Sequence, residues 1–135
     1  MTHYEERLDK DLTEIRGHVA TMAGLVETMV SNAMQALQSG DTTLAAETVI
    51  SDHPVNRMMR RIDDMCHRFI AVHLPSAGHM RLISSVIRAN IELERIGDYA
   101  VTISREALQV SEPPSGSMAE ELDRVAKETM TMLHQ

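Results

Sequence analysis

The amino-acid sequence predicts an all-α protein: an antiparallel, up-down-up three-helix bundle with an additional C-terminal helix. Apolar residues make up 43% of the 135 residues, but aromatic residues only 2%, and methionine occurs 11 times. Such a core suits packed helices, whereas β-sheets are enriched in aromatic and β-branched residues. In addition, apolar residues recur in alternate steps of three and four, which places them on one helix face.

The first helix is expected over residues 4–38. Its apolar face consists of Leu8, Leu12, Ile15, Val19, Met22, Val26, Met29, Ala33 and Leu37. This spacing averages about 3.5 residues per turn, which is typical of the seam of a bundle or coiled coil. The helix should end at Gly40, because glycine readily adopts the left-handed conformation of a C-cap, and Asp41 should cap the next helix.

The second helix is expected to begin at Thr42 and to be interrupted near Pro54. Proline lacks an N–H group and clashes with the preceding turn. The chain therefore either starts a new segment capped by Asp52, with Pro54 in its first turn, or kinks there. Beyond this point the predicted apolar positions are Val55, Met58, Ile62, Met65, Phe69 and Val72. Leu74 and Pro75 should end the segment.

The third helix is expected from Ser76, as its cap, to Val110. Its predicted apolar face consists of Leu82, Val86, Ala89, Leu93, Ile96, Ala100, Ile103, Ala107 and Val110. At 1.5 Å per residue this helix would be roughly 50 Å long. Three helices of similar length joined by short turns should pack antiparallel, which gives a bundle over residues 1–111.

A linker is predicted over residues 112–117, because two prolines, serines and a glycine cluster there. A last periodic segment, 118–135, reads as the first helix of a second, incomplete bundle. The sequence contains no further helices for it to pack with. Either the chain is a shortened form, or this helix is swapped onto or packed against a second copy.

Composition and motifs exclude several classes of protein. The net charge of -7 opposes nucleic-acid binding, which depends on neutralising phosphates. Cys66 is the only cysteine, so an internal disulfide and a cysteine-based zinc site are excluded. No apolar stretch approaches the roughly 20 residues of a membrane span. The first ten residues are rich in charged side chains, which is unlike a signal peptide. Walker A, serine-elbow and Glu-x-x-His motifs are missing. We expect a cytoplasmic protein that is not an enzyme and does not insert into a membrane.

The third helix carries the first candidate site, Glu94 and Asp98. Residues four apart share a helix face, and two carboxylates at this spacing can bind divalent cations. The alternative is a solvated acidic face paired with neighbouring arginines. Gly97 lies between them, where it either permits close helix packing or clears space for a ligand.

Three further sets of residues allow a functional or a structural interpretation. Asp63 and His67 are also four residues apart. They are either a second metal-binding arm or an exposed acid–imidazole pair. His73 and His79 flank Pro75, where they either converge or are ordinary polar residues at helix ends. Arginines recur at intervals on two helices. They form either stripes that dock an acidic partner or faces that are simply solvated. These stripes are Arg81, Arg88 and Arg95, and Arg57, Arg61 and Arg68. Ile87 and Ile91 lie off the main seam, which suggests a partly apolar outer face.

The string Leu93-Glu94-Arg95-Ile96-Gly97-Asp98-Tyr99-Ala100 resembles the PhoU family of phosphate-uptake regulators. Supporting matches are Ile70-Ala71 before Pro75, Arg81-Leu82 after it, the stretch 22–27, and Asp52 and Asn56 through Ile62-Asp63 to Cys66. The resemblance covers about residues 5–110.

The resemblance implies an all-helical, cytoplasmic protein that usually contains two such bundles in tandem and is not an enzyme. It implies a negative regulator of phosphate uptake and phosphate-starvation signalling. Family members are thought to couple the transporter, through its ATPase subunit, to the sensor histidine kinase of the phosphate two-component system. Homodimers and metal clusters held by paired acid-x-x-x-Asp motifs are common in the family.

Carried over residue by residue, the family's metal ligands are incomplete. Asp63, Glu94 and Asp98 match, but Met59 stands where the family has an acid, and His79 stands where it has an aspartate. These departures disfavour a multinuclear iron cluster. The remaining expectations are a single divalent or iron-type ion on Asp63, His79, Glu94 and Asp98, or no metal.

The sequence is therefore interpreted as an adaptor that works by protein–protein contact. Arg95, Arg88 and Arg81 are the expected partner-binding residues. One alternative is a stand-alone metal-binding or metal-sensing bundle. Another is a dimeric coiled-coil module without a ligand, in which Glu94→Ala and Arg95→Ala would leave every interaction intact.

Overall fold

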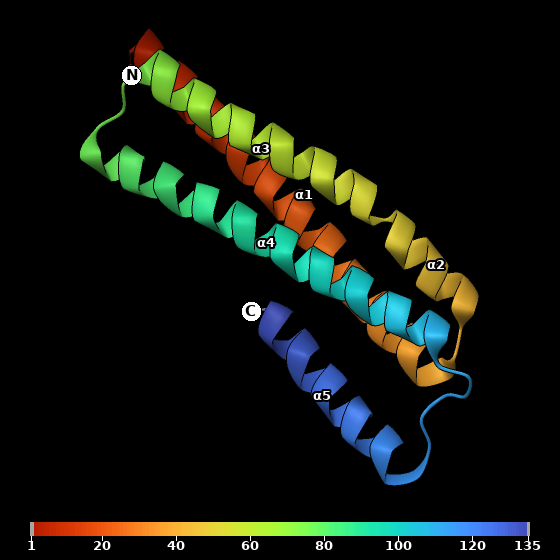
Figure 1. The fold of residues 1–135 in the computed structure, drawn as a ribbon. Coiled ribbons are helices and arrows are strands. Elements are labelled where there is room, and N and C mark those ends of the chain that lie inside the picture. Colours follow the sequence, from red (N-terminus) through yellow and green to blue (C-terminus); the bar gives the residue numbers. More distant parts are fainter. Residues whose placement is uncertain (1, 135) are drawn as a thin grey trace.

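A computed structural model describes residues 2–134, which contain five helices and no strand. The helices are α1 (His3–Ser39), α2 (Thr42–Ile50), α3 (Asp52–His73), α4 (Ala77–Gln109) and α5 (Gly116–His134). α1, the α2–α3 pair and α4 lie side by side as three antiparallel rods (Figure 1). The predicted all-α, up-down-up bundle is confirmed. In this part of the chain no helix is long and apolar enough to span a membrane.

The helix ends follow the expected local chemistry. α1 begins with a capping box in which Thr2 and Glu5 satisfy each other's backbone N–H groups. It ends at Gly40, whose φ of 73° is left-handed. The Asp41 side chain accepts a hydrogen bond from the Leu44 N–H and caps α2. The Ser76 hydroxyl caps α4 in the same way.

The second rod is divided at a single residue, Ser51. Ser51 remains in the right-handed helical region, and its side chain makes no capping hydrogen bond. Asp52 is the first residue of α3 and not its cap, and Pro54 lies in the first turn, where a missing N–H is tolerated. The prediction of a new segment was therefore right, but the predicted cap was wrong by one position.

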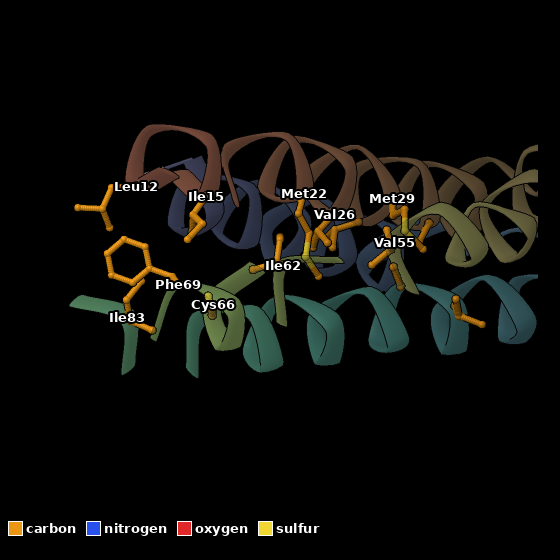
Figure 2. Close-up of a cluster of buried hydrophobic side chains, with 14 of the residues drawn as sticks. Leu12, Ile15, Met22, Val26, Met29, Val55, Ile62, Cys66, Phe69 and Ile83 are labelled. Carbon is orange, nitrogen blue, oxygen red and sulfur yellow. The ribbon is translucent and has the colours of Figure 1, made fainter. Parts of the chain in front are cut away.

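The core of α1 and α3 agrees closely with the predicted apolar faces. Figure 2 shows Ile15, Met22 and Val26 of α1 pointing towards Ile62 and Cys66 of α3. One prediction on α3 is wrong. Val72 is 54% exposed, and the neighbouring His73 is buried in its place.

On α4 the predicted apolar face is confirmed in part, because Ala100 and Ala107 are buried and most of the other predicted residues pack against the core. A line of buried residues that was not predicted runs beside it. Ile83, Asn90, Gly97 and Ser104 are buried at intervals of seven residues, whereas the predicted Ala89 and Val110 are exposed. Small side chains allow close approach: a Cβ added to Gly97 would lie 3.5 Å from Val55 and 3.9 Å from Val26. Gly97 therefore serves helix packing. An apolar pattern cannot reveal this line, because three of its four members are not apolar.

α5 packs along α1, which is the only helix it contacts in the described part of the chain. Ala126 is buried there, and the Gln38 amide donates a hydrogen bond to Asp123. The outer side of α5 exposes Met118 and Met132. The division into a bundle and a first helix of a second bundle stays a prediction. Met1 and Gln135, which bound the predicted domains, lie outside the described residues.

Candidate functional site

The carboxylates of Glu94 and Asp98 lie beside the buried line of α4. At 100° per residue, Glu94 lies about 50° around the helix from Asn90 and Gly97, and Asp98 lies about 100° from Gly97. Accordingly, Glu94 is half-buried and Asp98 is exposed. Among residues 2–134 neither carboxylate takes part in a salt bridge. The expected pairing with neighbouring arginines therefore does not form.

The packing of α3 against α4 separates Asp63 from this pair. The Asn90 amide donates a hydrogen bond of 2.9 Å to the Met59 carbonyl oxygen, and Val55 contacts Gly97. In this antiparallel register Asp63 lies level with residues 86–89. That is about 8–12 Å along the axis from Glu94 at 1.5 Å per residue. The two carboxylates therefore start from different levels of the bundle.

His79 is further away still, so the structure does not bring the four predicted metal ligands together. α4 is continuous from Ala77 to Gln109, and fifteen residues of helix separate His79 from Glu94. This corresponds to about 22 Å. Within residues 2–134, no three His, Cys, Asp or Glu side chains gather as a metal site. Met59 packs against the core instead of supplying a carboxylate. The residues present do not fit the metal centre that the resemblance implied.

The two other histidine candidates have structural contacts. His67 forms an exposed pair with Asp63, at 3.5 Å between Nδ1 and a carboxylate oxygen. His73 does not converge with His79. It is buried at the end of α3, where its Nε2 lies 2.6 Å from a carboxylate oxygen of Asp11 on α1. The Tyr4 hydroxyl donates a hydrogen bond to the His73 carbonyl oxygen, so α1 is tied to the end of α3.

His79 lines a groove between the first turns of α1 and α4. The other lining residues are Tyr4, Glu5, Leu8, Asp9 and Ser76, and the groove has a volume of about 620 Å³. We refer to it as the end groove. The sequence does not reveal this groove, because its two halves, Tyr4–Asp9 and Ser76–His79, lie about 70 residues apart in the chain. The only feature of the sequence that could have drawn attention to the groove is Tyr4, which is one of only three aromatic residues.

Three arginines of α4 form an exposed stripe. Arg81, Arg88 and Arg95 lie two residues before the buried positions 83, 90 and 97, and thus on the opposite side of the helix. Arg95 donates to both carboxylate oxygens of Glu92, at 3.0 and 3.1 Å. Arg81 and Arg88 form no salt bridge with any residue that the structure describes.

Apolar groups are mixed into this stripe. Ile91 is 47% and Tyr99 59% exposed, whereas Ile87 packs against the core. We call the set of Arg81, Arg88, Ile91, Arg95 and Tyr99 the α4 outer face. In the second predicted stripe, on α3, Arg61 donates to His18 and Arg68 pairs with Asp64. The α4 outer face is therefore the better candidate for docking.

Cys66 is buried in the core, and its environment holds it as a neutral thiol. Burial and, secondarily, the negative charge of Asp63 raise its pKa from 9.0 to about 11. At pH 8 the thiolate fraction is then about a hundredfold smaller than in the unfolded chain. We expect alkylation by iodoacetamide at pH 8 to be at least that much slower in the folded protein than in urea. Mass spectrometry at timed intervals measures both rates.

The same shift makes stability depend on pH. Because the folded pKa is the higher one, the unfolded chain loses this proton first, and stability falls as pH rises from about 9 to about 11. Urea unfolding at pH 8, 9 and 10 should show a smaller fall for Cys66→Ala than for the unaltered protein. If the stability of both proteins fell equally with pH, this would contradict the assignment of the pH dependence to Cys66.

The chain that forms this bundle matches a known protein family. The family model "PhoU domain" matches residues 19–107, which include most of the core of the bundle and the Glu94–Asp98 segment. This chain belongs to the PhoU family.

Two relatives are named as accessory proteins of the phosphate-specific transport system. The PhoU homolog of Pseudomonas putida is 41% identical over 110 residues, which cover 82% of this chain and 43% of that protein. PhoU of Escherichia coli K12 is 36% identical over 132 residues, which cover 98% of this chain and 55% of that protein. This chain thus spans about half the length of the curated relatives it matches.

The bundle also matches a solved PhoU structure. The crystal structure of PhoU from Pseudomonas aeruginosa superposes with a TM-score of 0.88 and 36% sequence identity, and it covers 93% of this chain and 61% of that one. The resemblance expected from the sequence and the PhoU-type bundle are confirmed.

Proposed function

We propose that this protein is an accessory regulator of a phosphate-specific transport system, and that it acts as an adaptor and not as an enzyme. The observation that carries the proposal is the PhoU domain over residues 19–107, together with relatives that are named as accessory proteins of the phosphate-specific transport system. Its partners would be the transporter's ATPase subunit and the sensor histidine kinase of the phosphate two-component system. It would work in the cytoplasm as a homodimer and repress uptake and starvation signalling when phosphate is plentiful.

The α4 outer face is the surface that we propose for the ATPase subunit. Arg81 and Arg88 are exposed cations that form no salt bridge with any of residues 2–134, and apolar area is added by Ile91, between Arg88 and Arg95, and by Tyr99, one turn beyond Arg95. Arginine and tyrosine are enriched among the residues that dominate binding at interfaces. α5 leaves this face uncovered, because it contacts only α1 among the described helices. An acidic surface with an apolar centre would complement it.

Charge reversal of the stripe tests the proposal. We expect the triple variant Arg81→Glu, Arg88→Glu, Arg95→Glu to bind the purified ATPase subunit at least tenfold more weakly, since an attractive surface becomes repulsive. Biolayer interferometry with the immobilised ATPase subunit measures the affinity. In cells, a phosphate-starvation reporter should stay active in phosphate-rich medium with this variant and be silenced by the unaltered chain.

A matched control comes from other exposed arginines. Arg7→Glu, Arg16→Glu and Arg57→Glu together change the net charge equally, but these residues lie on α1 and α3. This control should keep the affinity of the unaltered chain at physiological ionic strength. Equal weakening by both triple variants would show that only net charge matters and would contradict a specific α4 contact.

The alternative of a stand-alone metal-binding bundle gains no support from the geometry. The paired carboxylates of Glu94 and Asp98 acquire no third protein ligand in the part of the chain that the structure describes. Divalent ions in proteins commonly need more carboxylate and carbonyl oxygens than two side chains of one turn provide.

A further inference from the structure

The turn between α3 and α4 holds a residue whose conformation and exposure are both unfavourable. Leu74 has φ 44° and ψ 61°, in the left-handed region, and is the only non-glycine residue with positive φ among residues 2–134. Leucine is strained there, and the following Pro75 disfavours helical conformations further. Leu74 is also 84% exposed. Glycine would fit this turn better, so the fold itself does not explain a leucine here.

The end groove opens beside this turn. Its apolar floor comes from Tyr4 and Leu8 of α1, and Ser76, two residues after Leu74, lines the opposite wall. Tyr4 is half exposed, and its hydroxyl is held by the carbonyl oxygen of His73, the residue before Leu74. The exposed Leu74 is therefore the chain neighbour of the residue that holds Tyr4, at the same tip of the bundle as the groove.

The lining of the groove is acidic. Glu5 and Asp9 line it, and no lysine or arginine among the described residues forms a salt bridge with either carboxylate. Glu5 uses one oxygen for the cap of α1, but the Asp9 carboxylate makes no internal hydrogen bond in this part of the chain. His79 is turned to Ser76, with 3.1 Å between Nδ1 and the hydroxyl oxygen.

We propose that the end groove binds a peptide segment of a partner protein that carries an arginine or lysine next to a large apolar residue. The cation would lie against Asp9 and Glu5, and the apolar side chain would pack on Tyr4 and Leu74. Charge complementarity decides between occupants: an acidic peptide would be repelled, and an uncharged apolar one would leave two carboxylates without a partner at a desolvated site. This surface lies at the tip of the bundle and is separate from the α4 outer face.

The test uses the full chain and a defined probe, N-acetyl-leucyl-arginine amide. Titration is followed by ¹H–¹⁵N NMR, and we expect saturating shifts at Glu5, Leu8, Asp9 and Ser76. The citrulline analogue, which has the same shape without the charge, should bind at least fivefold more weakly. N-acetylarginine amide, which lacks the leucine, should also bind more weakly, and this would separate a peptide site from a simple cation site.

Two variants and a control assign the binding to these residues. Asp9→Asn should weaken the probe at least fivefold, and Leu74→Gly should weaken it while raising the urea midpoint of unfolding, because strain is relieved. Glu106→Gln, an exposed carboxylate at the far end of α4, should change nothing. Equal affinity for the citrulline analogue, unchanged binding by Asp9→Asn, or shifts spread over the whole surface would overturn the proposal. Binding of the ATPase subunit by Leu74→Gly is measured separately. A negative result with the peptide probe therefore does not bear on the proposed contact of the α4 outer face, which the arginine variants test.

Discussion

Ile62→Ala should lower the free energy of unfolding by about 3–4 kcal/mol, and the melting temperature by roughly 10 °C. Ile62 is fully buried on α3, and Figure 2 shows it lying between α1 and α4, near Met22 and Cys66. Removing three carbon atoms there leaves a cavity lined by three rods, which the long helices cannot collapse to fill. Urea unfolding monitored by circular dichroism at 222 nm measures the change.

Ile50→Ala is the matched control for this substitution. It removes the same atoms from the end of α2, where the side chain is 65% exposed. Its effect should stay within about 0.5 kcal/mol, as for most surface substitutions. If the two variants lost similar stability, the bundle interior would be packed differently from the arrangement described.

Gly97→Leu should cost about 3 kcal/mol or more, whereas Gly97→Ala should be neutral or stabilise the protein by up to about 1 kcal/mol. An added Cβ would lie at ordinary contact distance from Val55 and Val26, so alanine fits and gains helix propensity. The further carbon atoms of leucine have no space between α1 and α3 and would force the rods apart. Thermal unfolding of both variants gives the comparison.

This pair of variants also decides between the two interpretations of Gly97. If the glycine cleared space for a ligand beside Glu94 and Asp98, alanine would be expected to reduce partner binding without loss of stability. A packing role predicts that Gly97→Ala retains the affinity for the ATPase subunit. Strong destabilisation by alanine would contradict the distances of 3.5 and 3.9 Å between an added Cβ and the side chains of Val55 and Val26.

The local chemistry of the chain was enough to predict the helices. The spacing of Leu8, Ile15 and Met22 indicated the buried face of α1, and Gly40 and Pro75 indicated the turns. These signals act within one or two turns of helix. They involve backbone hydrogen bonds and the side of a helix that must leave water, so they do not depend on which helix packs opposite.

The candidate site was predictable only in part. The exposed Arg81, Arg88 and Arg95 followed from their interval of seven residues, which any continuous helix turns into a stripe. The metal set failed because the sequence gives no register between helices: Asn90 faces Met59, and this places Asp63 about two turns from Glu94. His79 is a different case: it lies on the same helix as Glu94, fifteen residues away, so their separation of about 22 Å already follows from one continuous helix.

The sequence by itself determined which segments are helical, where they end and which family the chain resembles, because each of these rests on neighbouring residues. Only the tertiary structure decided that Asn90, Gly97 and Ser104 belong to the buried face of α4, since the close packing of the rods buries them. It also brought Asp9 and His79 together in one groove. Such contacts depend on the distance and register between rods, which no single helix encodes.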